Sequence, residues 1–239
     1  MTTSAMTTLS LDLRENGPAG ASNGGFACGT LGGLVGGTAR VRLAAPIPLG
    51  VRLDVEIDVD GSEARIVRAG RTLATARAID PFVLEPPFRP TVDQAIEARR
   101  RHPFRGVRHL LSECVVCGPE RVDGLRVTPG PLFEDPDVLA APLLPTERFA
   151  VDGTVRAAAV WGALDCPSYP AAEARAGRLG LLGTLEGHLA RPIRVGEELV
   201  VVGWTIDSGH RSTRTASAIV DRDGTVVASG RAVWVALPS

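Results

Sequence analysis

Residues 45–55 read APIPLGVRLDV, and residues 191–201 read RPIRVGEELVV. The two stretches share the frame Pro-Ile-x-x-Gly-x-x-Leu-x-Val. Proline and glycine at a fixed spacing require a particular turn, so their joint recurrence is more informative than a match of apolar residues alone. The recurrence predicts that the chain contains two copies of one structural unit.

A second match lies downstream, between residues 70–79 (GRTLATARAI) and residues 224–233 (GTVVASGRAV). The two copies are offset by 146 residues in the first match and by 154 in the second. The second copy is therefore eight residues longer in the intervening hairpin. Hairpins tolerate such changes of length between related folds.

Each copy reads as a helix followed by strands. Residues 24–35 and 155–164 are apolar on nearly all sides, which is typical of a buried helix. Glycines in the first segment cost helix stability, about 1 kcal/mol each relative to alanine. We expect them to allow a close approach to a sheet.

Alternating apolar and polar segments follow each helix, with Asp-Gly hairpin signals at 60–61 and 223–224. Short turns between strands predict antiparallel pairing. The alternative architecture is an α+β sandwich of different topology. The expected strands are residues 40–45, 52–59, 63–68 and 72–79 in the first copy, and 183–189, 198–207, 211–221 and 225–237 in the second.

This pattern divides the chain into a unit at 1–80, a crossover linker at 81–120 and a second unit at 121–239. The linker is rich in proline and is expected to contain a short helix at 91–101. Residues 124–149 are expected to supply the first strands of the second unit.

Composition excludes several classes of function. The net charge of −1 over 239 residues argues against a nucleic-acid partner. Every basic side chain apart from histidine is arginine, so mechanisms that need a catalytic lysine are excluded. We find no signal peptide and no apolar run long enough to span a membrane, so we expect a cytoplasmic protein without a membrane partner.

Two motifs carry a family resemblance. Residues 24–31 (GGFACGTL) resemble a Gly-Gly-Gln-x-x-Gly-x-x-Leu helix start, and Ala163-Leu164-Asp165 resembles an acid on a second helix. Together the copies resemble the double-hotdog acyl-CoA thioesterases of the type II class. The resemblance implies an α+β tandem hotdog, with two antiparallel sheets that each wrap a long central helix. It also implies an acyl-CoA or acyl-thioester substrate bound between the units, no cofactor beyond the coenzyme A of the substrate, and a possible homodimer.

The family's catalytic pattern is an aspartate on the second helix, a Ser or Thr on the next strand and a Gln on the last strand. Asp165 matches the first position. Thr184 matches the second if a two-residue bulge is allowed, whereas a gap-free alignment places Leu182 there. The third position falls on Ala232, which leaves hydrolysis open. The other interpretation of Asp165 is a cap that ends the helix before Pro167.

Asn23, Gly24 and Gly25 are expected to bind substrate. Asn23 is a good N-cap, and the Gly-Gly start exposes backbone N–H groups at the positive end of a helix, where they can polarise a thioester carbonyl. His188 is a further candidate for substrate binding, and its alternative role is packing within a strand.

Cys114 and Cys117 form a single Cys-x-x-Cys pair. Structural zinc needs four ligands, and only His102 and His109 lie upstream to complete a site. We therefore expect no metal and buried thiols, with a redox role as the other alternative.

Three functions remain. The first is hydrolysis of an acyl thioester with Asp165 as base. The second is a non-catalytic module that binds an acyl thioester or lipid, which would explain Ala232. The third is enoyl-CoA hydration, which ranks last because no histidine lies near Asp165 in the sequence.

Overall fold

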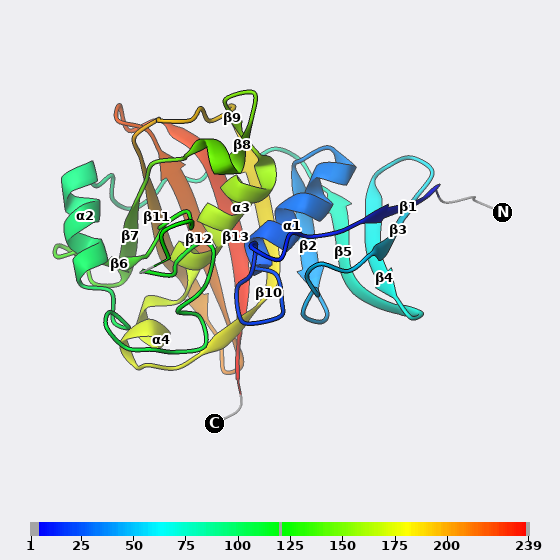
Figure 1. The fold of residues 1–239 in the computed structure, drawn as a ribbon. Coiled ribbons are helices and arrows are strands. Elements are labelled where there is room, and N and C mark those ends of the chain that lie inside the picture. The colour runs from blue at the N-terminus through cyan, green and yellow to red at the C-terminus, as the bar shows by residue number, and fades with distance from the viewer. Residues whose placement is uncertain (1–4, 120, 238–239) are drawn as a thin grey trace.

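The computed structural model describes residues 5–119 and 121–237. Residues 1–4, 120 and 238–239, which fall within the predicted units and linker, lie outside the described residues. The described chain forms an 11-stranded antiparallel sheet in the order β1-β3-β4-β5-β2-β10-β13-β12-β11-β7-β6, and helices α1 and α3 pack on one of its faces (Figure 1).

The first copy contains one helix and five strands. Its helix ends in a short 3-10 turn at Gly33–Val35. Strand β1 was not predicted, and the other strands fall within a few residues of their predicted positions. The elements are β1 (Ala5–Leu9), α1 (Gly24–Gly32), β2 (Ala39–Leu43), β3 (Leu53–Ile57), β4 (Glu63–Arg68) and β5 (Arg71–Ala78).

The second copy repeats this plan with longer hairpin strands, which is where its eight extra residues lie. Helix α2 (Val92–Arg100) precedes it and begins at a capping box formed by Thr91 and Gln94. Its elements are β6 (Gly130–Pro131), β7 (Val138–Leu143), β8 (Ala150–Val151), β9 (Thr154–Val155), α3 (Ala157–Asp165), α4 (Ala171–Arg175), β10 (Gly180–Leu189), β11 (Leu199–Ser208), β12 (Ser212–Val220) and β13 (Val226–Ala236), with 3-10 turns at Glu147–Phe149 and Cys166–Ser168.

The two expected sheets are joined edge to edge into one, because β2 of the first copy pairs with β10 of the second. Their register runs from Thr184 opposite Arg42 to Gly187 opposite Ala39. Each strand would otherwise leave its N–H and C=O groups unpaired at a sheet edge. Glu186 also bridges this joint, since it lies 2.6 Å from Arg40 and 3.2 Å from Arg231.

The central helices are shorter than expected, at nine residues each. Gly36 and Gly37 adopt positive φ values of 93° and 86°, which ends the first helical segment. Pro167 follows α3 and converts its continuation into a 3-10 turn.

Glycines in α1 permit a close approach to α3, rather than to the sheet as expected. A Cβ on Gly25 would lie 2.4 Å from the carbonyl oxygen of Trp161, and a Cβ on Gly29 would lie 2.7 Å from Cα of Ala158. Both distances are too short for a side chain. The two backbones therefore touch directly, and this contact brings the N-terminus of α1 to the C-terminus of α3.

The two copies exchange side chains across this contact. Trp161 of α3 is fully buried in the core of the first copy, together with Leu53 and Leu185. Phe26 of α1 is fully buried in the core of the second copy, beside Phe149. Each copy thus completes the core of the other.

The crossover begins on the face of the sheet opposite to α1 and α3. The backbone N–H of Leu84 donates to the hydroxyl of Ser229 at 3.0 Å, and Arg231 stacks over Phe82. Helix α2 then covers β7, where Ala95 and Ala98 are fully buried. None of the helices that the structure describes has the length or the apolar run needed to cross a membrane.

Candidate active site

Asp165 lies where the C-terminus of α3 meets the N-terminus of α1. Its Oδ2 atom accepts a hydrogen bond from the N–H of Gly25 at 2.8 Å and another from the side-chain amide of Asn23 at 3.0 Å. The residue is only 3% exposed, and its Oδ1 atom has no hydrogen-bond partner among the described residues. One carboxylate oxygen is therefore held in place, while the other is buried without a hydrogen-bond partner among the described residues.

Asn23 has two functions at this junction. Its Oδ1 atom accepts from the N–H of Phe26 at 3.0 Å and so caps α1, while its amide nitrogen faces Asp165. The cap orients the amide, and the positive end of α1 faces the carboxylate. Sequence analysis predicted the cap but not the bond to Asp165, which spans 142 residues.

The environment of Asp165 changes its acidity. Burial raises the pKa of this carboxyl from 3.8 to about 7, and the hydrogen bonds from Gly25 and Asn23 act in the opposite direction. A carboxyl with a pKa near neutrality can take up or release a proton under physiological conditions.

A largely apolar cavity of about 360 Å³ opens beside this carboxyl. Asn23, Gly24 and Asp165 lie at its polar end, and Leu182 and Trp234 contribute to its apolar walls. The indole N–H of Trp234 donates to the hydroxyl of Ser168 at 3.0 Å, which fixes that wall. The volume lies in the range of small-molecule sites.

The two glycines at the start of α1 differ in what their N–H groups do. The N–H of Gly25 is bonded to Asp165. Gly24 lines the cavity, and in the part of the chain that the structure describes its N–H has no acceptor. Sequence analysis predicted that the N–H groups of Gly24 and Gly25 donate to a carbonyl oxygen. Of these two, only the N–H of Gly24 has no acceptor among the described residues.

Thr184 and His188 are not brought together with Asp165. The pairing of β10 with β13 shifts at Gly183, between Leu182 and Thr184, which is a β-bulge. Because side chains alternate along a strand, the bulge leaves Leu182 facing Gly24 and turns Thr184 to the opposite face of the sheet. Leu185, the next residue, is fully buried on the helix face.

His188 lies on the same outer face as Thr184. Its Nδ1 atom is 2.9 Å from the hydroxyl of Thr38, and its ring lies beside Phe82 of the crossover. Ala232 faces the helices, buried against Leu185 and Trp161, so the position of the family's glutamine is apolar.

Three thiols border the cavity next to Asp165. The Sγ atoms of Cys114, Cys117 and Cys166 lie within 4.8 Å of one another. No local motif pointed to Cys166, because it lies 49 positions after Cys117 in the chain. Hydrogen bonds from Cys117 and Cys166 hold the pKa of the Cys114 thiol well below its usual value, whereas the hydrogen bonds to Cys114 and burial raise the pKa of the Cys117 and Cys166 thiols.

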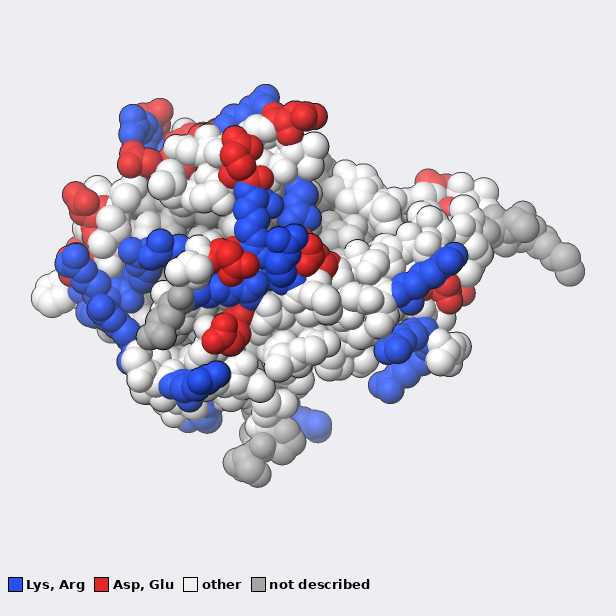
Figure 2. Space-filling view, in the orientation of Figure 1, with Lys and Arg blue, Asp and Glu red and all other residues white. Residues whose placement is uncertain are grey.

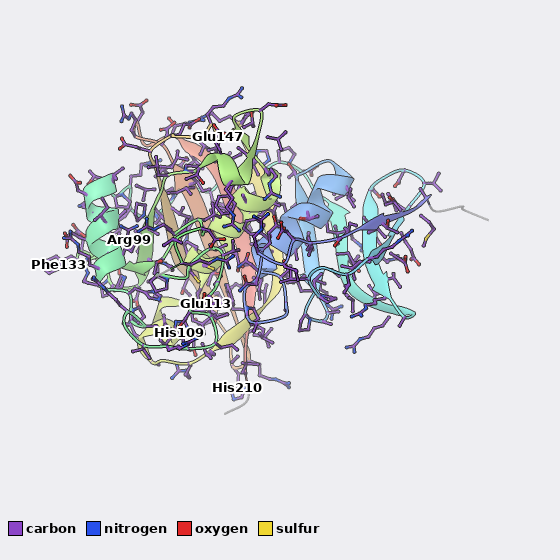
Figure 3. All side chains as sticks on the ribbon, viewed as in Figure 1. Arg99, His109, Glu113, Phe133, Glu147 and His210 are labelled. Carbon is purple, nitrogen blue, oxygen red and sulfur yellow. The ribbon has the colours of Figure 1, made fainter. Side chains whose placement is uncertain are left out.

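His109 lines a neighbouring pocket together with Cys117 and Cys166, and its Nε2 atom is buried without a hydrogen-bond partner among the described residues. His102 bonds to the carbonyl of Pro129 at 2.6 Å, and Nδ1 of His109 accepts from the N–H of Leu111 at 3.3 Å. Figure 3 shows His109 toward the same end of the molecule as His210, which lies in the turn between β11 and β12.

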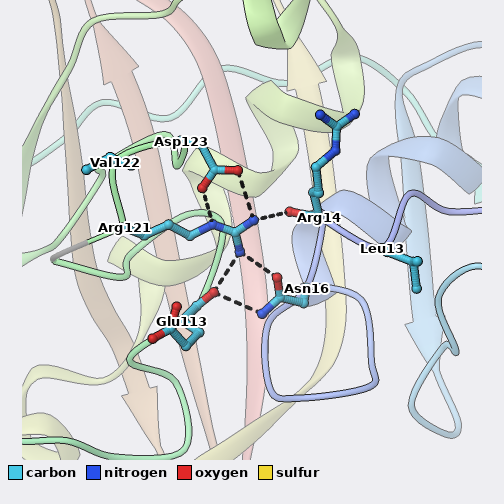
Figure 4. Close-up of a pocket in the computed structure, with 7 residues that line it drawn as sticks. All are labelled: Leu13, Arg14, Asn16, Glu113, Arg121, Val122 and Asp123. Atoms are coloured by element: carbon cyan, nitrogen blue, oxygen red, sulfur yellow. Dashed lines mark hydrogen bonds and ion pairs between the residues drawn. The ribbon is translucent and has the colours of Figure 1, made fainter.

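Arg121 anchors the segment that carries Cys114 and Cys117. Its guanidinium donates to the carbonyl of Glu113 at 2.7 Å, to the side chain of Asn16 at 2.5 Å and to the carbonyl of Arg14 at 2.6 Å (Figure 4). Asp123 neutralises it at 2.7 Å. Arginines and acidic side chains lie next to one another in the middle of this face (Figure 2), where Arg14 pairs with Asp12, and Arg121 and Arg148 pair with Asp123.

Comparison with known proteins identifies the fold. No family model and no curated protein matches the chain. A candidate thioesterase from Novosphingobium aromaticivorans DSM 12444 is similar in structure at 13% identity, with a TM-score of 0.65 over 98% of this chain and 96% of that one. The tesB protein of Mycobacterium avium subs paratuberculosis gives 12% identity and a TM-score of 0.65, over 98% and 93%.

A hot dog fold protein of unknown function from Alicyclobacillus acidocaldarius matches 99% of this chain and 96% of its own, at 12% identity and a TM-score of 0.57. At such identities the likeness concerns the fold alone. The chain has a hotdog fold that spans both of its copies, as the family resemblance implied.

Proposed function

We propose that this hotdog chain hydrolyses an acyl thioester. The expected substrate class is acyl-CoA. The observation that carries the proposal is the state of Asp165. It is a buried carboxyl with a pKa of about 7, with one oxygen fixed by Gly25 and Asn23 and the other unbonded, at the polar end of an apolar cavity. A pKa near the working pH and an unpartnered oxygen beside the cavity suit a general base. The Novosphingobium aromaticivorans neighbour, a candidate thioesterase, is named for the same class of reaction.

The geometry supports the following mechanism. The acyl chain occupies the cavity against Leu182 and Trp234, and the N–H of Gly24 donates to the thioester carbonyl oxygen. Oδ1 of Asp165 accepts a proton from a water molecule, whose oxygen forms a bond to the carbonyl carbon. The carbon–sulfur bond then breaks, and the proton on Asp165 passes to the leaving thiolate. The products are the free acid and the thiol, and no cofactor is consumed; coenzyme A arrives as part of the substrate.

The test is thiol release from acyl-CoAs of graded chain length by wild type and Asp165→Asn. We expect the substitution to lower kcat/KM by about 100-fold or more, because it removes the base. For metal-free wild type, kcat/KM is expected to rise with pH through an apparent pKa near 7, since only the ionised carboxyl accepts a proton.

The second candidate is a module that binds an acyl thioester without cleaving it. It is favoured by Ala232 and Leu182, which leave the cavity side of the sheet apolar where the family has polar groups. This function would be supported if the wild type bound acyl-CoA saturably without releasing thiol, and if Asp165→Asn bound it with the same affinity. Such a result would contradict hydrolysis. Enoyl-CoA hydration is not favoured, because no histidine is among the described residues that line the cavity.

A further inference from the structure

The three thiols beside the cavity come from two separate parts of the chain. Cys114 and Cys117 belong to the crossover, and Cys166 follows the last residue of α3. Their Sγ atoms lie within 4.8 Å of one another, and those of Cys114 and Cys166 are 4.0 Å apart. Thiolates bound tetrahedrally to zinc at about 2.3 Å are about 3.8 Å from each other. The sulfurs are thus spaced for a common metal after a small contraction.

Backbone and side-chain N–H groups are directed at these sulfurs. The N–H of Val116 lies 3.4 Å from Sγ of Cys114, and the amide of Asn23 lies 3.7 Å from Cys114 and 3.8 Å from Cys166. N–H donors stabilise thiolates, which are the form of cysteine that binds metal, and outer donors of this kind orient metal ligands.

The loop geometry explains how one short segment presents two sulfurs together. The N–H of Gly118 donates to the carbonyl of Cys114 at 3.0 Å. A Cβ on Gly118 would lie 2.6 Å from that oxygen, so this tight turn requires glycine. The segment is further held by Arg121 and by a bond from the N–H of Val115 to the carbonyl of Asn16.

We propose that Cys114, Cys117 and Cys166 bind one zinc ion. Sulfur ligands select soft or borderline metals such as zinc over magnesium or calcium. Among the described residues no further His, Cys, Asp or Glu ligand atom lies within 4.8 Å of all three sulfurs. All three residues line the cavity, so the fourth position of the metal faces the cavity beside Asp165. His109, whose Nε2 atom is buried without a partner among the described residues and which lines a neighbouring pocket with Cys117 and Cys166, lies outside this group. This proposal goes beyond thioester hydrolysis, whose mechanism above uses no metal. The bound ion would fix the crossover to the end of α3 and so hold one wall of the cavity.

The test uses the full chain after reduction, with four free thiols confirmed by titration in denaturant. Cobalt(II) serves as the spectroscopic probe, and zinc is then added in competition. We expect a sulfur-to-cobalt charge-transfer band, intense visible bands of a tetrahedral ion, displacement by zinc at one equivalent per chain, and a higher melting temperature with zinc.

Cys166→Ser is the decisive variant, and Cys28→Ser is its matched control, because Cys28 is a buried thiol outside the cluster. Cys166→Ser is expected to bind cobalt at least about tenfold more weakly, whereas Cys28→Ser binds as wild type does. A third variant, Cys166→His, is expected to keep the metal with a shifted charge-transfer band, which separates loss of a ligand from loss of the fold.

Two results would overturn the proposal. One is the absence of a charge-transfer band in fully reduced wild type. The other is equal affinity for cobalt in Cys166→Ser and Cys28→Ser. Neither readout depends on thioester cleavage, so failure of the zinc site and failure of the proposed hydrolysis are distinguishable.

Discussion

At the scale of single residues, Asp165 is the most unusual group in the molecule. It is a carboxyl buried between two helix ends, and its two bonded donors, Asn23 and Gly25, come from the other copy of the repeat. Burial of a charged carboxylate costs free energy unless hydrogen bonds or an opposite charge stabilise it. The two hydrogen bonds to Oδ2 offset only part of this cost. The raised pKa follows from this imbalance.

This imbalance predicts a dependence of stability on pH. The pKa of Asp165 is about 7 in the folded chain and 3.8 in a free side chain, so the folded chain keeps a proton that the unfolded chain has released. The free energy of unfolding therefore falls as pH rises from about 4 to about 7. Asp165→Asn removes this titration, and its stability relative to wild type should increase over that range by up to about 4 kcal/mol.

Urea unfolding of both proteins at several pH values measures this difference. A difference that stays constant across the range would show that Asp165 is already ionised in acid, and would contradict the raised pKa.

A second prediction at this scale concerns Thr184 and His188, which lie on the face of the sheet away from the cavity. Thr184→Ala and His188→Ala are each expected to leave kcat/KM for acyl-CoA within about twofold of wild type, because neither side chain reaches the cavity. A loss comparable to that of Asp165→Asn in either variant would refute this placement of the strand.

At the scale of elements, the contact between α1 and α3 positions the candidate site. The helices touch through glycine because neither backbone leaves room for a Cβ at Gly25 or Gly29. Displacement of α1 would also separate the N–H of Gly25 from Asp165. Stability and the geometry of the site therefore depend on the same contact.

Gly25→Ala tests this contact, with Gly33→Ala as its control. The added methyl at position 25 would overlap the backbone of Trp161, and we expect a loss of about 1–3 kcal/mol in the free energy of unfolding. Gly33 has φ −59° and no atom within 4 Å of an added Cβ, so its substitution should be neutral or stabilising by up to about 1 kcal/mol. Chemical denaturation measures both, and equal effects would argue against close packing of the helices.

At the scale of the whole molecule, the two copies form one cooperative structure. The β2–β10 joint makes the sheet continuous, and Trp161 and Phe26 each lie in the core of the opposite copy. Neither copy can therefore unfold without exposing part of the core of the other.

Leu53→Ala provides the test, because Leu53 is fully buried in β3 of the first copy. Trp204 packs against the core of the second copy, and it is followed alone in a background with Trp161→Phe and Trp234→Phe. Leu53→Ala is expected to cost about 2–5 kcal/mol and to shift the midpoint of tryptophan fluorescence as far as that of circular dichroism. An unchanged fluorescence midpoint would show that the two copies unfold independently.

Local pattern was sufficient to predict most elements of the fold. The Pro-Ile-x-x-Gly frame and the Asp-Gly turns placed the paired strands of each copy within a few residues, because alternation and turn chemistry depend on neighbours in the chain. The same reasoning placed α1 and α3, and it marked Asp165 as an acid in an apolar helix. The unit boundaries and the expected homodimer remain predictions.

Tertiary structure alone decided how these parts meet. The bulge at Gly183 turns Thr184 away from the helices. A shift of one residue in a strand moves every later side chain to the opposite face of the sheet. Residue propensities do not predict the position of such a bulge. The joining of the two sheets, the bonds of Asp165 to Asn23 and Gly25, and the meeting of Cys166 with Cys114 and Cys117 all link residues far apart in the chain. Such contacts depend on how the two copies pack against each other. Local sequence therefore determined the repeated unit, and the packing of one copy against the other formed the candidate site.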